Sequence, residues 1–492
     1  MRVLIAFVLA LCVTACADNT DGSVISNVTI VSAGESTPSP MDVYIDDGRI
    51  VAIGEPGSFD DRSPAIVIDG SGKFLTPGLI DGHTHLAEIP GMTFEHERNY
   101  PDIAAAARRQ IPRSYLYHGF TTVIDLNSNP VSMNRWNRAP LRPRAYFCGA
   151  SPVFDGYPMS FMPTPQRYEW MPYFLFDETR ADDFPEGYER GNHTPSAVVD
   201  RIHADGGICL KTHYERGAGG RGNLPLPTAD LFNELVTAAH ERGLPVLVHA
   251  NREYAQRFAI ETDVDAFAHG MFDWDDRSTT ELHDAVREVA DAMIVKDIAL
   301  QPTIQVLYGE QDLYDPDYFD NPELHAVLPA SLIDWYQTDD GQWWVRRNLE
   351  VPVIRDFVES GRWAELDAPF IARVSAVLGY FAANGGTLLF GSDTPADPTY
   401  ANPPGLNGRL EMDRWIAAGV TPEQLFMAAT VNNAGFFGLD EIGTIAPGKR
   451  ADLLILDENP LETVTAWDTI EYVLLSGYVI ERATLSALAG RN

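Results

Sequence analysis

Short apolar runs alternate with longer amphipathic stretches through the central part of the chain. Strands that alternate with helices in this way are typical of a parallel sheet with crossover helices. The stretch 227–242, with apolar residues at Leu231 and Leu235, has the period of a helix. Eight strands are predicted, at 79–81, 121–126, 145–149, 208–211, 246–249, 266–269, 299–303 and 387–391. Eight such units predict an α/β fold, a (β/α)8 TIM barrel with its active site at the carboxyl ends of the strands.

Both ends of the chain show a different pattern, with β-type runs and turn signals but little helical periodicity. Asp47-Gly48 marks a hairpin turn in the N-terminal part. A half-sheet this small needs a partner to bury its apolar face. We therefore predict one small β-sandwich built from residues 23–75 and 438–492, with the barrel spanning 76–437.

Two long connections interrupt the regular spacing of the barrel, at 151–193 and 306–363. Both are rich in tyrosine, tryptophan and phenylalanine, which argues against disorder. Long loops in a compact domain are usually functional, and both follow barrel strands. We expect them to cover the active-site mouth. The alternative is that they form packing or oligomer surfaces, which leaves a homo-oligomer open.

The first sixteen residues have the features of an export signal. An apolar run too short to cross a membrane follows Arg2. The sequence VTAC, ending at Cys16, resembles the site at which a bacterial lipoprotein is cut before a lipidated cysteine. Ordinary signal cleavage after Ala15 is the alternative. With 17–22 as a polar tether, we expect a periplasmic protein, either free or held to the outer membrane by a lipid on Cys16.

The charge of the chain limits its partners. The sequence has 36 basic and 70 acidic residues, a formal net charge of −34. This balance argues against binding to nucleic acid or to an anionic membrane surface. We interpret the charge as favouring solubility, and the lipid anchor as the only membrane contact.

Two cysteines remain in the mature chain if Cys12 is removed and Cys16 is lipidated. Cys148 and Cys209 both lie in strand-like runs, so we interpret them as buried free thiols. A disulfide between them stays open, because sequence does not set its geometry.

Polar side chains end the predicted barrel strands. His83 and His85 are two residues apart, so on a strand they point to the same face. Other strands end in Lys211, His249, His269 and Asp393. A charged residue at the end of an apolar strand costs burial energy unless it is paired or bound to metal. Four histidines, one lysine and one aspartate at one rim therefore indicate a metal site.

These motifs resemble the amidohydrolase superfamily of metal-dependent hydrolases over about residues 40–482. The resemblance rests on PGLIDGHTH at 77–85, GFTTVID at 119–125, the strand-end series and GTIAPGKRADL at 443–453. The spacing is most similar to the imidazolonepropionase-like and Xaa-Pro or Xaa-Arg dipeptidase-like branch. One departure is the segment GRLE at 408–411, where that branch often has a histidine before the glutamate.

The resemblance implies a pair of divalent metal ions, which zinc suits with nitrogen and oxygen ligands. It also implies that Lys211 is carboxylated by CO2, so that its carbamate bridges both ions. A carbamate is anionic, whereas a lysine ammonium beside two cations would be repelled. The implied ligands are His83, His85 and Asp393 for the more buried ion, and His249 and His269 for the second ion.

The implied reaction is hydrolysis of an amide or peptide-like bond by a hydroxide that bridges the two ions. Asp393 would be the catalytic residue, since it can orient the hydroxide and move its proton to the leaving group. The expected substrate is a small amide or dipeptide-like molecule. Substrate contacts are expected from Tyr214, Arg216 and Arg252, because an arginine can hold a carboxylate with two hydrogen bonds.

Two other readings stay open. The same metal pair could act on a lactone or a phosphoester, because such a site does not fix the bond type. A reading of another class is a tethered binding lipoprotein that keeps the barrel without catalysis. The complete strand-end series argues against it, since an inactive site has no need of six aligned polar groups.

Overall fold

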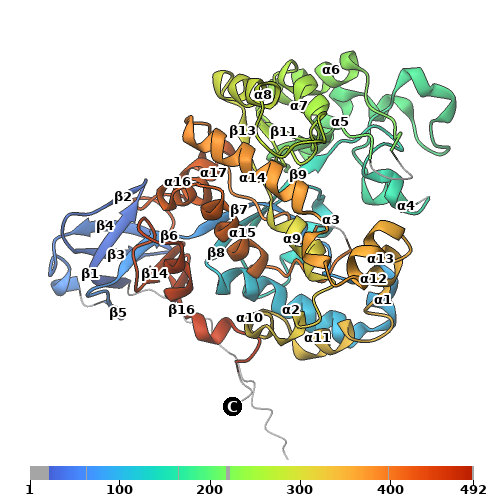
Figure 1. Cartoon of the computed structure of the whole chain (residues 1–492). Coiled ribbons are helices and arrows are strands. Elements are labelled where there is room, and N and C mark those ends of the chain that lie inside the picture. The colour runs from blue at the N-terminus through green and yellow to red at the C-terminus, as the bar shows by residue number, and fades with distance from the viewer. Residues whose placement is uncertain (1–21, 63, 165, 218–221, 397, 490–492) are drawn as a thin grey trace, which may run out of the picture.

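The computed structural model describes residues 22–62, 64–164, 166–217, 222–396 and 398–489 (Figure 1). The expected signal at 1–16, including Cys16, lies outside the described residues, as does the tether except Gly22. Within the described ranges, no helix has the length and apolar character needed to cross a bilayer.

Seven parallel strands among the described residues form the wall of a barrel, in the order β13-β12-β11-β10-β9-β8-β7. Their bounds are β7 Leu79–Thr84, β8 Phe120–Asp125, β9 Arg144–Ala150, β10 Cys209–His213, β11 Val246–His249, β12 Ala266–Phe267 and β13 Ala299–Leu300. Each strand is near its predicted place because the apolar runs that mark it are buried on both faces.

The eighth predicted strand, 387–391, closes the barrel without forming a regular strand. Leu389 donates its N–H to the carbonyl of Leu300 in β13, and the N–H of Gly82 in β7 donates to the carbonyl of Phe390. The segment therefore bonds to both edges of the seven-stranded sheet. The predicted (β/α)8 barrel is confirmed, and its last strand is an irregular segment.

Helices surround this barrel and fill the two long connections (Figure 1). Those that follow barrel strands include α2 Pro101–Tyr117, α3 Pro130–Trp136, α5 Pro195–Ala204, α6 Ala229–Glu241, α7 Glu253–Ile260, α8 Asp284–Val295, α14 Ala368–Ala383, α15 Leu406–Ala417, α16 Pro422–Met427 and α17 Asn433–Phe436. Helix α8 begins at Asp284, after a non-helical stretch at 278–283. The N–H groups of Ser278 and Glu281 bond to nearby side chains instead, and such bonds compete with a helix.

Both long connections contain helices, and the second is mainly helical. The first contains α4 Gln166–Trp170 and packs on its own apolar cluster, which includes Phe154, Met159 and Phe174. The second contains α9 Gln305–Asp312, α10 Pro322–Val327, α11 Ala330–Tyr336, α12 Trp343–Asn348 and α13 Pro352–Glu359. It packs on the loop and the short helix α1 Phe94–Asn99 that follow β7, where Tyr336 donates to the carbonyl of Pro90.

A second sheet combines both ends of the chain, in the order β16-β15-β14-β6-β1-β3-β4, with β2 and β5 beside β1. Figure 1 shows the N-terminal strands in blue beside the C-terminal strands in red. The bounds are β1 Ser23–Ser32, β2 Glu35–Ser36, β3 Met41–Asp46, β4 Arg49–Gly54, β5 Ile66–Asp69, β6 Phe74–Pro77, β14 Leu453–Leu456, β15 Ile470–Leu475 and β16 Tyr478–Glu481. Its core joins Ile25 and Val43 to Leu453 and Leu474, so neither end buries its apolar face alone.

Candidate metal centre

Strand β7 brings the first histidines to the carboxyl end of the barrel. All six of its residues are buried, and His83 is only 1% exposed. The buried carboxylate of Asp81 accepts the backbone N–H of His83 at 3.2 Å and that of Ser392 at 2.9 Å. Because both backbones donate to one carboxylate, the end of β7 is fixed to the segment that carries Asp393.

Asp393 is the point at which three histidines meet. Its Oδ1 lies 2.9 Å from Nε2 of His85 and 3.1 Å from Nε2 of His83. Its Oδ2 lies 3.7 Å from Nδ1 of His269, which follows β12. The N–H of Asp393 donates to the carbonyl of His83 at 2.7 Å. Histidines from two separate segments therefore share one carboxylate.

Lys211 and His249 come from the neighbouring strands β10 and β11. Both side chains are buried. The strands are parallel, and their register places His213 opposite His249, two residues beyond Lys211. The ring of His249 lies 4.5 Å from that of His269, centroid to centroid. The histidines singled out in the sequence thus form one continuous cluster across the barrel rim.

Burial and the charge of Asp393 act in opposite directions on the histidines of the cluster. Burial lowers the pKa of His83 to about 4, against the attraction of Asp393. Burial also opposes protonation of His85, but its hydrogen bond to Asp393 and the charge of that carboxylate raise its pKa to about 9. Although burial opposes it, the neighbouring histidines hold the pKa of Asp393 well below its ordinary value. The carboxylate is therefore anionic at neutral pH, as a metal ligand must be.

Burial also governs the protonation of the other members. It lowers the pKa of Lys211 to about 7, although Asp393 partly offsets the effect. It lowers the pKa values of His249 and His269 well below the ordinary histidine value. Neutral imidazoles are the form that binds a metal ion, and a neutral amine is the form that reacts with CO2.

The residues present fit a divalent metal ion. One ligand atom from each of His83, His269 and Asp393 can be chosen so that all three lie within 4.8 Å of one another. Nε2 of His249 and Nδ1 of His83 are buried and have no hydrogen-bond partner among the described residues. Buried polar atoms without partners are costly, and coordination of a metal would satisfy such an atom. Nitrogen and oxygen donors in this mixture suit zinc.

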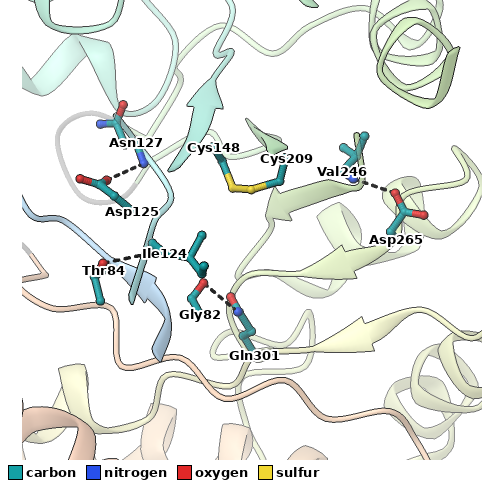
Figure 2. Close-up of a disulfide and its surroundings, with 10 residues drawn as sticks. All are labelled: Gly82, Thr84, Ile124, Asp125, Asn127, Cys148, Cys209, Val246, Asp265 and Gln301. Atoms are coloured by element: carbon teal, nitrogen blue, oxygen red, sulfur yellow. Dashed lines mark hydrogen bonds between the residues drawn. A yellow bond between two sulfur atoms is a disulfide. The ribbon is translucent and has the colours of Figure 1, made fainter. Parts of the chain in front are cut away.

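A disulfide joins Cys148 of β9 to Cys209 of β10 inside the barrel (Figure 2). The interpretation of the two cysteines as free thiols is therefore wrong. The two residues are direct register partners with Cα atoms 4.5 Å apart, a pairing that the sequence does not set. Cys209 precedes Lys211 by two residues, so both side chains project from the same face of β10.

The three residues expected to contact substrate lie in different surroundings. Tyr214 stacks on a phenylalanine of α7, with centroids 3.8 Å apart, between strand and helix. Nε of Arg252 lies 3.3 Å from Glu215 and 3.7 Å from Asp273, so this guanidinium links the loops after three strands. The side chain of Arg216 is exposed. Tyr214 and Arg252 are thus engaged by neighbouring side chains, whereas Arg216 faces solvent. Substrate contact by all three residues stays a prediction.

Two residues near the cluster were not assigned roles from the sequence. Thr303 places its Oγ1 2.9 Å from Nδ1 of His269. Tyr157, from the first long connection, stacks on His249 with centroids 4.4 Å apart. Thr303 stood at the end of a predicted strand and Tyr157 in an aromatic loop, but nothing in the sequence gave their distance from the histidines.

Comparisons with protein families match two parts of the chain. Residues 74–303 and residues 356–480 each match a family model described as "Amidohydrolase family". The first match contains the strands that carry the four histidines and Lys211, and the second contains Asp393. Between them lie 304–355, which include α9 to α12 of the second long connection.

Individual proteins are similar over shorter or longer parts. An imidazolonepropionase of Stenotrophomonas maltophilia is 43% identical over 60 residues, which are 12% of this chain and 15% of the relative. A dihydroorotase of Enterococcus faecalis is 41% identical over 90 residues, 18% of each chain. These matches span less than a fifth of either relative. A crystal structure of a Xaa-Pro dipeptidase with bound methionine is 19% identical with a TM-score of 0.63, covering 94% of this chain and 100% of that one, which shows a common fold.

Proposed function

The chain belongs to the amidohydrolase superfamily, and on this premise we propose that it is a metal-dependent hydrolase that cleaves a carbon–nitrogen bond in a small amide. The observation that carries the proposal is the shared carboxylate of Asp393. It lies within 3.7 Å of three histidines from two other strands, beside the buried Lys211 and His249. Such a mixed set of buried groups has a clear purpose only if cations bind among them.

The proposed site holds two divalent ions, most simply zinc. His83, His85 and Asp393 would hold one ion and His249 and His269 the other, and Lys211, once carboxylated, would supply an anionic ligand between them. When bound, the ions supply a hydroxide at neutral pH and polarise the carbonyl of the substrate. Asp393 is the remaining base. It accepts the proton of the attacking hydroxide at a carboxylate oxygen and passes it to the leaving nitrogen.

The environment of Asp393 keeps the carboxylate deprotonated and fixed in position. The carboxylate is buried and anionic, and it is fixed by two hydrogen-bonding imidazoles and by its own N–H. A base held on a rigid frame needs no reorganisation when the proton moves. Asp393 would move the proton over a short distance, because the attacking hydroxide and the leaving nitrogen would both lie at the same rim of the barrel.

The proposed substrate is a small amide or a dipeptide-like molecule. Xaa-Pro dipeptidase and imidazolonepropionase, the names of two compared proteins, support this range without choosing within it. The proposed enzyme acts in the periplasm, free or anchored through a lipid on Cys16. The Cys148–Cys209 disulfide supports export, because structural disulfides persist in oxidising compartments.

The test is a hydrolysis screen of protein lacking residues 1–16, reconstituted with zinc and bicarbonate. The library contains dipeptides, N-acyl amino acids, cyclic amides, lactones and phosphoesters, and release of amine, acid or phosphate is measured. Cleavage of amides, lost in Asp393→Asn and Lys211→Ala but kept in Lys296→Ala, is the expected result. Lys296 is a suitable control because its amine donates to the carbonyl of Ile260 at the protein periphery.

Other results would change the conclusion. Turnover of lactones or phosphoesters alone would replace the carbon–nitrogen bond with another bond at the same site. Two bound metals without turnover of any compound would contradict the proposed chemistry. Absence of bound metal would favour the binding-protein reading. Mass spectrometry of the N-terminal peptide from membrane-extracted protein shows whether Cys16 carries a diacylglyceryl group, and so whether the protein has a lipid anchor.

A further inference from the structure

A row of aromatic rings runs outward from the histidine cluster. Tyr157 stacks on His249 with centroids 4.4 Å apart and planes inclined by 26°. Tyr157 also contacts the ring of His213 at 5.9 Å and that of Phe161, which meets it edge to face at 5.5 Å. Phe161 is 50% exposed, an unusual state for a large apolar side chain so near buried polar groups. The row therefore connects a proposed metal ligand to solvent.

A second aromatic pair lies beside the first in the same connection. The short 3-10 turn Met159–Phe161 packs on α4, which carries Trp170. The ring of Trp170 lies 4.7 Å from that of Phe94 in α1, centroid to centroid. Phe94 is 37% exposed. Phe94 follows β7 and Trp170 follows β9, so the contact joins loops from two barrel strands. We call Tyr157, Phe161, Trp170 and Phe94 the aromatic wall.

The aromatic wall rests on a fixed base. Phe154, Met159 and Phe174 beneath it are fully buried in one apolar cluster. Asp155 receives Nη1 of Arg167 at 2.8 Å and the hydroxyl of Tyr168 at 2.7 Å. A surface held in this way presents its rings in one arrangement, which lowers the entropic cost of binding a flat ligand.

Two arginines of the same connection, Arg167 and Arg180, are directed into the protein, whereas Arg190 is exposed. Arg167 pairs with Asp155 and also donates to the carbonyl of Met162. Arg180 donates to the carbonyl of Phe154 at 2.8 Å and lies over its ring at 4.2 Å. These guanidinium groups hold the wall rather than offering charge to a ligand. The face beside Tyr157 is therefore suited to an uncharged group.

We propose that the aromatic wall is the specificity surface of the site, and that it receives an aromatic side group of the substrate next to the scissile bond. This inference rests on the proposed function and names its substrate class. A flat apolar group gains contact area and favourable ring geometry against Tyr157 and Phe161. A small or charged group gains neither.

The first test measures binding without requiring turnover. Methylphosphonate and benzylphosphonate share one anionic head group for the zinc-loaded protein and differ by a phenyl ring. Titration calorimetry should give benzylphosphonate about tenfold tighter binding, the order expected for one buried ring. Phe161→Ala should remove most of that preference, and Phe161→Tyr should keep it. Equal affinities, or binding of neither compound, would overturn the proposal.

The matched control is Val295→Ala. Val295 is also a large exposed apolar residue, at 86%, but it ends α8 and precedes β13, at the opposite end of the barrel from the cluster. Its loss should leave both affinities unchanged. A similar fall in both variants would show a general effect of surface apolar residues and would also overturn the proposal.

The second test separates this inference from the proposed function. It compares N-phenylacetylglycine with N-acetylglycine, and glycylphenylalanine with glycylalanine, by kcat/KM. A preference for an aromatic member that falls about tenfold in Phe161→Ala supports the wall. Amide cleavage with no aromatic preference rejects the wall and leaves the proposed function standing. Benzylphosphonate selectivity without cleavage of any amide supports the wall and rejects the proposed function.

Discussion

The hydroxyl of Thr303 forms a hydrogen bond with the ring of His269. Its Oγ1 lies 2.9 Å from Nδ1 of the histidine, and both residues are buried. Thr303 has a φ of +49°, a left-handed conformation that a β-branched residue rarely adopts. Because one ring nitrogen is engaged with the hydroxyl, the other is left for a metal ion, and the ring cannot rotate freely.

Thr303→Val should weaken metal binding while leaving the fold intact. Valine has the same shape and the same β-branch, so the substitution removes the hydrogen bond and little else. Loss of a partner behind a ligating histidine typically costs 10- to 100-fold in metal affinity, and we expect about tenfold. Zinc retained against a competing chelator measures it.

The control for this prediction is Thr303→Ser, which keeps the hydroxyl. It should retain zinc like the unchanged protein. Equal loss of zinc in both variants would show that the methyl packing, and not the hydrogen bond, matters. The thermal midpoint of the metal-free protein should change little in Thr303→Val.

Glu411 fixes the backbone that follows Thr303. Its buried carboxylate accepts the N–H groups of Ile304 at 2.9 Å and Gln305 at 2.5 Å, and also the indole N–H of Trp415. Burial, opposed by these bonds, raises the pKa of Glu411 to about 7. The segment GRLE, which departs from the resembled branch, thus ends in a residue that supports the histidine cluster.

Glu411→Gln should destabilise the protein more at pH 5 than at pH 8. Folding raises the pKa of this carboxyl from 4.5 to about 7, so the group stabilises the folded protein at pH values below 4.5. That contribution to the free energy of unfolding is lost as the pH rises to 7. The uncharged glutamine lacks this titration, so the cost of the substitution should shrink across that window, by up to about 3 kcal/mol. Urea unfolding midpoints of both proteins at several pH values measure it, and a constant difference would contradict the assignment.

The barrel could be predicted because its signals are local. Each buried parallel strand is a short apolar run, and a run such as 246–249 is reproduced by β11 without change. Where the structure differs from the prediction, contacts between residues far apart in the sequence determine the local conformation. The segment 387–391 is apolar like a strand, but it meets its neighbours through a few hydrogen bonds and a single bridge between Leu300 and Leu388.

The candidate site was predictable to the extent that the barrel places strand ends together. His83, Lys211 and Asp393 needed only their positions in the chain to be singled out. Thr303 needed its neighbour in space, since a threonine after a strand has no signature of its own. The Cys148–Cys209 bond similarly depends on the register of β9 against β10, which no periodicity specifies.

Reconstitution of the metal site should depend on pH through Lys211. Burial lowers the pKa of its amine to about 7, so most of it is neutral at pH 8 and cationic at pH 6. Only the neutral amine can add CO2 to form the carbamate. Zinc uptake in the presence of bicarbonate should therefore be faster and more complete at pH 8. Metal content after gel filtration measures it, with Lys211→Ala as the control that shows little uptake at either pH.

The disulfide should stabilise the barrel and leave no free thiol in the mature chain. Protein lacking residues 1–16, unfolded without reductant, should show no reaction with a thiol reagent, and two reactive thiols would contradict the pairing. The bond closes a loop with a sequence separation of 61, for which loop-closure entropy predicts about 4 kcal/mol. Cys148→Ala combined with Cys209→Ala also leaves space inside the barrel, so the unfolding midpoint in urea should fall below that of the unchanged protein. Adding reductant to the unchanged protein should reproduce most of the fall, because reduction removes the cross-link without creating a cavity.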